Sequence, residues 1–93
     1  MGRPSVGISV QSSAGDVYRV VVTQGRDETR HEVTVTPEDV KRYAPGSTPE
    51  RLLEVSFEFL LEREPASSIL PRFALPVIER YFPEYPRVIA RML

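Results

Sequence analysis

Four prolines divide the last third of the chain, and this segment constrains the fold more than any other. They are Pro71, Pro76, Pro83 and Pro86, in the stretch SILPRFALPVIERYFPEYPRVIARML. Each proline lacks a backbone N–H and has a fixed φ, so the segment can form only short helical pieces. Large apolar side chains lie between the prolines. Such a segment is stable only where it covers an apolar surface that the rest of the chain supplies.

The first third of the chain alternates apolar and polar residues with a period of two, which is typical of strands. We expect strands over residues 5–11, 17–24 and 30–36, with turns at residues 12–16 and 25–28. Because the links are short and only one face is apolar, the pattern predicts a three-stranded antiparallel meander with one solvated face.

Two Thr-Pro pairs mark the starts of helices. Thr36-Pro37 and Thr48-Pro49 place a good N-cap residue before a proline at the first helical position. The first helix is expected to end near Tyr43. The second helix should be the longest element of the chain.

The long helix is predicted over Pro49–Arg63, and its apolar residues spread over about two thirds of its circumference. It therefore needs cover on two sides, which the sheet and the proline-divided tail can supply. In the tail we expect a turn or short helix over residues 66–72 and helices over 76–82 and 84–92. The aromatic residues expected to lie in the core or at its rim are Tyr81, Phe82 and Tyr85.

These elements predict an α+β fold in a single domain over residues 1–93, with the strands within about 5–36 and the helical part within about 37–93. A 93-residue chain with 41% hydrophobic and 27% charged residues can build one modest core.

Composition excludes several kinds of chemistry. There are no cysteines and one histidine, so disulfides, thiolate metal sites and a cysteine nucleophile are excluded. No glycine-rich phosphate loop or nucleophile elbow occurs. We therefore predict no enzymatic activity, no catalytic residue, no metal and no cofactor. The sequence has no apolar run long enough to span a membrane and no signal-peptide core, so we predict a cytoplasmic protein that does not bind membranes.

His31 shares a strand face with Val33 and Val35, which predicts a structural histidine at the edge of the core. Glu32 is adjacent in sequence but points to the opposite face of a strand, so the two side chains cannot form an acid–base pair.

An acidic ridge on the long helix is the strongest candidate for a partner-binding site. Its members are Glu50, Glu54, Glu58 and Glu62, which recur every four residues. Like charges at this spacing destabilise a helix by about 0.2–0.5 kcal/mol per pair. Three interpretations remain open: a solvated face with a few arginine pairs, a contact for a basic partner, or a divalent metal on the row. The last would be a poor site, because no histidine or convergent loop completes it.

The second half of the chain resembles a family of short bacterial proteins of unknown function. The resemblance rests on the FLLEREP stretch at residues 59–65 with the residues just before it, on Ser68-Ile69-Leu70, and on the RYFPEY stretch at residues 80–85. It covers about the last 45 residues well and the strands only by pattern. It implies a complete natural domain with an N-terminal strand region, and it implies no activity, substrate or catalytic residue.

The favoured function is a small interaction or regulatory domain that acts through protein contacts. The acidic ridge and an open strand edge are the two surfaces that can carry it, and the open edge also predicts a homodimer. The alternative is a nucleic-acid-associated regulator of antitoxin-like type, using sheet and tail arginines. The net charge of −1 and the absence of aromatics at expected exposed strand positions make nucleic acid the less favoured partner.

Overall fold

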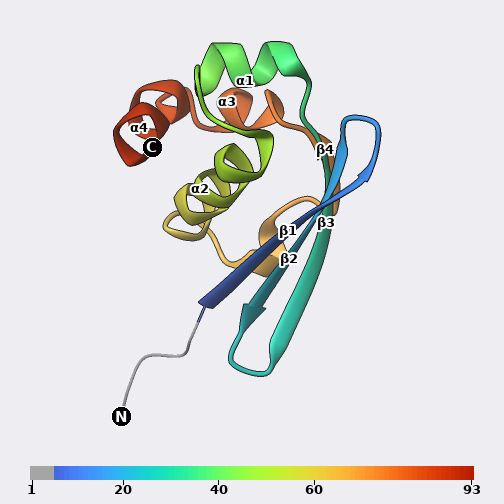
Figure 1. Ribbon diagram of the computed structural model, residues 1–93. Coiled ribbons are helices and arrows are strands. Elements are labelled where there is room, and N and C mark those ends of the chain that lie inside the picture. The colour runs from blue at the N-terminus through green and yellow to red at the C-terminus, as the bar shows by residue number, and fades with distance from the viewer. Residues whose placement is uncertain (1–5) are drawn as a thin grey trace.

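In the computed structural model, which describes residues 6–93, four strands form one sheet and the helices lie on one side of it (Figure 1). The elements in chain order are β1 (Val6–Ala14), β2 (Val17–Gln24), β3 (Asp27–Thr34), α1 (Pro37–Tyr43), α2 (Pro49–Leu61), the 3₁₀ turn η1 (Ala66–Ser68), β4 (Arg72–Ala74), α3 (Val77–Tyr81) and α4 (Tyr85–Met92). The predicted α+β class, with a meander followed by helices, is confirmed.

The first three strands form the expected antiparallel meander, in the order β1-β2-β3. Each hairpin turns through two residues, and the first of these is a glycine: Gly15 with φ 56° and Gly25 with φ 61°. Positive φ at this position is the requirement of a type II′ turn, which matches the twist of the flanking strands. The turns are tighter than predicted, so β1 extends to Ala14 and β3 begins at Asp27.

A fourth strand, β4, completes the sheet and was not predicted. It pairs in parallel with the outer side of β3, with Phe73 opposite Val33. The Glu32 N–H donates to the Pro71 carbonyl (2.8 Å), and the Leu75 N–H donates to the Thr34 carbonyl (3.0 Å). A segment of three residues between prolines is too short to show the hydrophobic period of a strand in the sequence. It forms a strand only because it lies beside β3.

The helix starts follow the sequence signals. Thr36 caps α1 and Thr48 caps α2, each followed by a proline in the first turn. The predicted bounds of α1 are confirmed. The long helix ends at Leu61 rather than Arg63, because the Arg63 N–H already bonds to the Leu60 carbonyl in a tighter turn (2.9 Å).

Helix α2 lies at the centre of the core and is covered on two sides, as its wide apolar surface predicted. The Phe57 ring meets His31 of β3 at a centroid distance of 5.3 Å, and the Phe59 ring meets Tyr85 of α4 at 5.3 Å. One aromatic thus faces the sheet and the other faces the tail. The fully buried α2 residues are Leu52, Leu53, Val55, Ser56, Phe57 and Phe59.

One prediction for the tail is wrong. Tyr81 was expected in the core or at its rim, but it is 67% exposed, whereas Tyr85 is fully buried and Phe82 is partly buried. Tyr81 is the last residue of the five-residue helix α3. Ile78, one turn earlier, already covers the core.

Candidate binding surfaces

The acidic ridge lies on the exposed side of α2, next to β1. Two of its glutamates have arginine partners: Arg51 Nη1 lies 2.8 Å from Glu54 Oε1, and Arg63 Nη1 lies 3.5 Å from Glu62 Oε1. Both glutamates remain well exposed, and exposed pairs of this kind contribute about 0–1 kcal/mol. Glu58 forms no ion pair with any other residue in 6–93.

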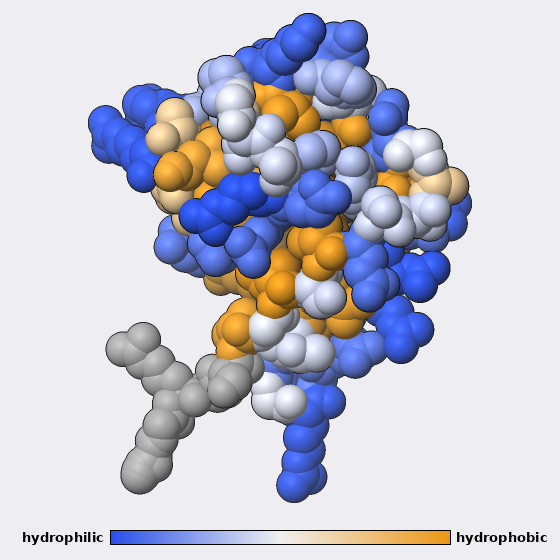
Figure 2. All heavy atoms as spheres, in the orientation of Figure 1, coloured by the Kyte–Doolittle hydropathy of each residue, from blue (hydrophilic) through white to orange (hydrophobic). Residues whose placement is uncertain are grey.

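Three ridge residues meet β1 in an open hollow of about 410 Å³. We call this the β1–α2 groove; it is lined by Val6, Ile8, Glu54, Glu58, Leu61 and Glu62. The groove thus combines three aliphatic side chains with three carboxylates. In Figure 2, hydrophobic surface extends to the end of the sheet where β1 begins, with hydrophilic side chains around it.

Glu50, the fourth ridge residue, is not part of the groove. It lies near Tyr18, whose pKa is raised mainly by burial and next by the Glu50 charge. Tyr18 pairs with Ser12 near the end of β1, whereas Val6 and Ile8 at its start meet the later glutamates. Helix α2 therefore runs along β1 in the opposite direction (Figure 1).

Strand β1 forms one edge of the sheet and carries no charge along its nine residues, VGISVQSSA. In antiparallel sheets, alternate residues direct both backbone groups to the same side. The backbone of Glu32 in β3 hydrogen-bonds to the β4 segment, so its N–H and C=O groups point away from β2. The backbone groups of Arg19, opposite Glu32 in β2, therefore point to β1. Those of Gln11, opposite Arg19 in β1, point back to β2. The intervening residues Ile8 and Val10 therefore direct their N–H and C=O groups to the open edge.

Two arginines on the outer face of the sheet, away from the helices, are paired with carboxylates. Arg30 Nε lies 3.0 Å from Glu28 Oε2, and Arg72 Nε lies 3.2 Å from Glu32 Oε1. The carboxylate partner of Arg72 is thus on β3 and not on the acidic ridge. Arg19 lies on the same face, opposite Glu32 in the strand register, and forms no ion pair among residues 6–93. Because the carboxylates of Glu28 and Glu32 lie between these arginines, this face does not form a continuous basic stripe for phosphates.

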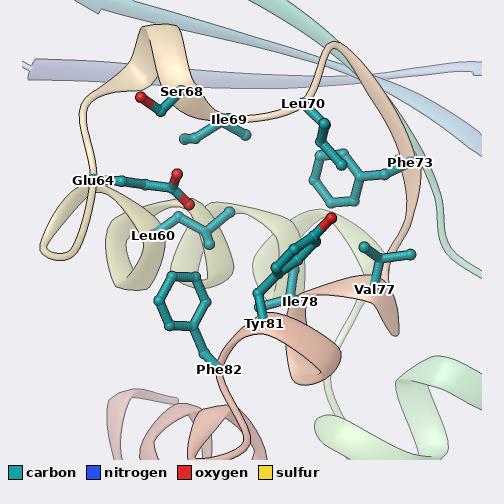
Figure 3. Close-up of a pocket in the computed structure, with 10 residues that line it drawn as sticks. All are labelled: Leu60, Glu64, Ser68, Ile69, Leu70, Phe73, Val77, Ile78, Tyr81 and Phe82. Atoms are coloured by element: carbon teal, nitrogen blue, oxygen red, sulfur yellow. The ribbon is translucent and has the colours of Figure 1, made fainter.

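A separate apolar pocket of about 250 Å³ opens in the tail and was not predicted (Figure 3). Glu64 projects into it from just after α2, and the Tyr81 ring closes it from α3. Exposed Leu70 adds to its rim. Its volume is below the roughly 300–1,000 Å³ of small-molecule sites. The only sequence signal for it was the excess of apolar residues in the tail.

His31 is structural, as its strand face predicted. It is 2% exposed, and its Nδ1–H donates to the Leu70 carbonyl at 2.8 Å, since a carbonyl can only accept. Its Nε2 lies 2.9 Å from Thr29 Oγ1, and the ring packs on Phe57. Both ring nitrogens thus have partners, and the Nδ1 bond ties β3 to the segment before β4.

Within residues 6–93, no group of three or more histidine, aspartate or glutamate side chains is placed to hold a metal ion. Among the helices of the described chain, none is long and apolar enough to cross a membrane.

Comparison with known proteins yields no match: no family model, no curated protein and no solved structure is similar to this chain. The family resemblance seen in the tail therefore stays a prediction.

Proposed function

We propose that this protein is a non-catalytic interaction domain that binds a partner protein along β1 and the adjoining side of α2. The observation that carries the proposal is the unprotected edge of β1. Its backbone groups at Ile8 and Val10 are directed outward, and no charge or proline along the strand hinders a second strand from pairing.

The other edge of the sheet, formed by β4, is protected against pairing with a further strand. Strand β4 has three residues, lies between Pro71 and Pro76, and presents the exposed Arg72. Short length, prolines and charge are the devices by which natural proteins prevent edge pairing. Strand β4 has all three, whereas β1 has none of them and carries only a bulge near its end, between Ser12 and Ala14. The regular part of β1 before this bulge therefore supports a binding role.

The proposal is tested with a matched pair of variants on β1. Val6 is 51% exposed on the helix side of the strand, and Ser9 is exposed on the opposite side. A lysine at either position keeps the strand but places charge on one face only. We expect a partner captured from the native cell by the wild-type chain to be lost with Val6→Lys and retained with Ser9→Lys. If no captured protein depends on Val6, the proposal fails.

The predicted homodimer uses the same edge, because a second copy can pair through its own β1. Light scattering at about 100 μM decides this, since self-association depends on concentration. A strict monomer would rule out the homodimer and leave a different protein as the partner.

The salt dependence of binding distinguishes the nucleic-acid alternative from the protein-interaction proposal. Phosphate contacts weaken steeply between about 50 and 200 mM salt. Mobility-shift assays with duplex and single strands at low salt should show no binding. Salt-sensitive binding would replace the interaction proposal with a nucleic-acid-associated regulator.

We also place the protein in the cytoplasm. The absence of cysteine supports this, because extracellular domains this small commonly depend on disulfides. Localisation of a tagged full-length chain in the native cell tests it, and a membrane or secreted pool would contradict it.

A further inference from the structure

We infer that the occupant of the β1–α2 groove is an extended, basic segment of the partner, with lysine or arginine at alternate positions, which adds to the sheet beside β1. This inference rests on the proposed function and names the chemistry of its partner. Three features of the groove support it: the direction of the free backbone groups, the spacing of the carboxylates, and the mixture of aliphatic and acidic side chains.

The free backbone groups select an extended chain. The N–H and C=O groups of Ile8 and Val10 point to the open edge, while their side chains pack toward the helix side of the sheet. A strand that pairs with this edge lies about 4.8 Å from β1. Its alternate side chains then project on the helix side, over the groove.

The spacing of the carboxylates matches that of a strand. Successive glutamates of the ridge, Glu54, Glu58 and Glu62, are four residues apart, a helical rise of about 6 Å, with Glu62 as the C-cap directly after the last residue of α2. Side chains on one face of a strand recur every two residues, about 6.7 Å. Because α2 runs along β1, each carboxylate can meet one side chain of the added strand.

The lining of the groove selects lysine or arginine for these side chains. Their aliphatic stems can lie on Val6, Ile8 and Leu61, while their charged ends reach the glutamates. Glu58, at the middle of the row, has no ion-pair partner within residues 6–93. An incoming cation there displaces no existing pair.

A second copy fits this groove poorly. When two β1 strands pair antiparallel across a twofold axis normal to the sheet, the α2 helices of both copies lie on the same face. The two rows of glutamates would then approach each other, and like charges brought together at an interface oppose association. The groove therefore favours a basic segment over a second β1.

The test uses a fluorescent, capped peptide in which lysine alternates with valine and threonine, titrated with the full chain by anisotropy. A peptide with glutamate in place of lysine is the matched probe. We expect saturable binding of the lysine peptide only. Glu58→Gln should weaken it about threefold, and the Glu54, Glu58 and Glu62 triple glutamine variant by about tenfold or more. Glu38→Gln, outside the groove, should leave it unchanged.

Two N-methylated peptides separate strand addition from simple charge attraction. Methyl groups on every second amide block hydrogen bonding on one side of the strand only. One set of methylations should abolish binding and the other should preserve it. Equal affinities would show that charge alone holds the peptide, which would overturn the inference of an added strand.

A random peptide display library distinguishes failure of this inference from failure of the proposed function. Alternating basic peptides that lose binding in Val6→Lys would support the inference. If the selected peptides lack basic residues but still lose binding in Val6→Lys, the inference of a basic partner is overturned, whereas the proposed interaction surface is supported. If no peptide depends on Val6, and affinity capture also finds no Val6-dependent protein, both proposals fail.

Discussion

Inside the core, one hydrogen bond joins two fully buried side chains. Ser56 Oγ of α2 lies 2.7 Å from the Tyr85 hydroxyl of α4, and both residues are 0% exposed. Each hydroxyl therefore removes the cost of burying the other, which makes the pair a specific link between the long helix and the tail.

A double-mutant cycle should measure this link. Ser56→Ala leaves the Tyr85 hydroxyl buried without its partner, which costs about 1–3 kcal/mol of unfolding free energy, and Tyr85→Phe does the same to Ser56. The double variant should lose less than the sum of the single losses, by about 1 kcal/mol. Urea unfolding measures all four proteins. Strict additivity would show that the hydroxyls do not interact.

His31 should be the most sensitive polar residue on the sheet. His31→Ala removes its hydrogen bond to the Leu70 carbonyl and its packing on Phe57, and we expect a loss of about 3 kcal/mol. His31→Asn can restore a donor near the Nδ1 position and should recover part of the loss. Thermal and urea unfolding would contradict this structural role if His31→Ala stayed within about 0.5 kcal/mol of the wild type.

At the scale of elements, the start of α1 is held by a reciprocal cap. Thr36 Oγ1 accepts from the Asp39 N–H at 3.1 Å, and Asp39 Oδ2 accepts from the Thr36 N–H at 3.0 Å. Thr48 caps α2 on one side only, by accepting from the Arg51 N–H. Both caps were readable in the sequence, because the residues involved lie within three positions of each other.

Thr36→Ala should therefore lower the unfolding free energy by about 1 kcal/mol, since it leaves the Asp39 N–H without its acceptor. Thr36→Ser keeps the oxygen and is the control that should restore most of the stability. The comparison is made by urea unfolding. Equal losses in the alanine and serine variants would point to the lost methyl group rather than the cap.

Local signals also explain which other elements were predictable. The bounds of β2 and the start of α2 follow from period and capping within a few residues. Strand β4 does not, because Arg72–Ala74 becomes a strand only through hydrogen bonds to β3, about forty residues earlier. The exposure of Tyr81 was mispredicted for a related reason: which residues of a short helix reach the core depends on where the helix docks.

At the scale of the whole molecule, buried tyrosines couple stability to alkaline pH. Tyr43 is 3% exposed and donates to Glu79 Oε1 at 2.7 Å. Burial, and next the hydrogen bond to Glu79, raise the pKa of Tyr43 from 10.0 to about 12. Burial also raises the pKa of Tyr85. The folded state therefore holds these protons at a pH where the unfolded chain releases them.

The stability that depends on Tyr43 should be fully present below about pH 10 and lost as the pH rises through about 12. A shift of this size corresponds to roughly 2–3 kcal/mol. Urea unfolding at a series of alkaline pH values should show this decline, and Tyr43→Phe, which cannot titrate, should show a shallower one. Parallel profiles for the two proteins would contradict the assignment.

The candidate site shows the same division between local and tertiary information. The sequence predicted the acidic row and an open strand edge as two separate surfaces, without identifying which strand forms the edge. Their union in the β1–α2 groove was not predicted, and neither was the exclusion of Glu50 from it.

The sequence by itself determined the α+β class, the meander, the capped helices and the need for α2 to be covered twice. These properties depend on residues close together in the chain, where period, capping and proline geometry act. Only the tertiary structure decided that the proline-divided tail lends a strand to the sheet and that α2 lies along β1. Packing brings those segments together across many intervening residues, and no local signal records which surfaces will then share one groove.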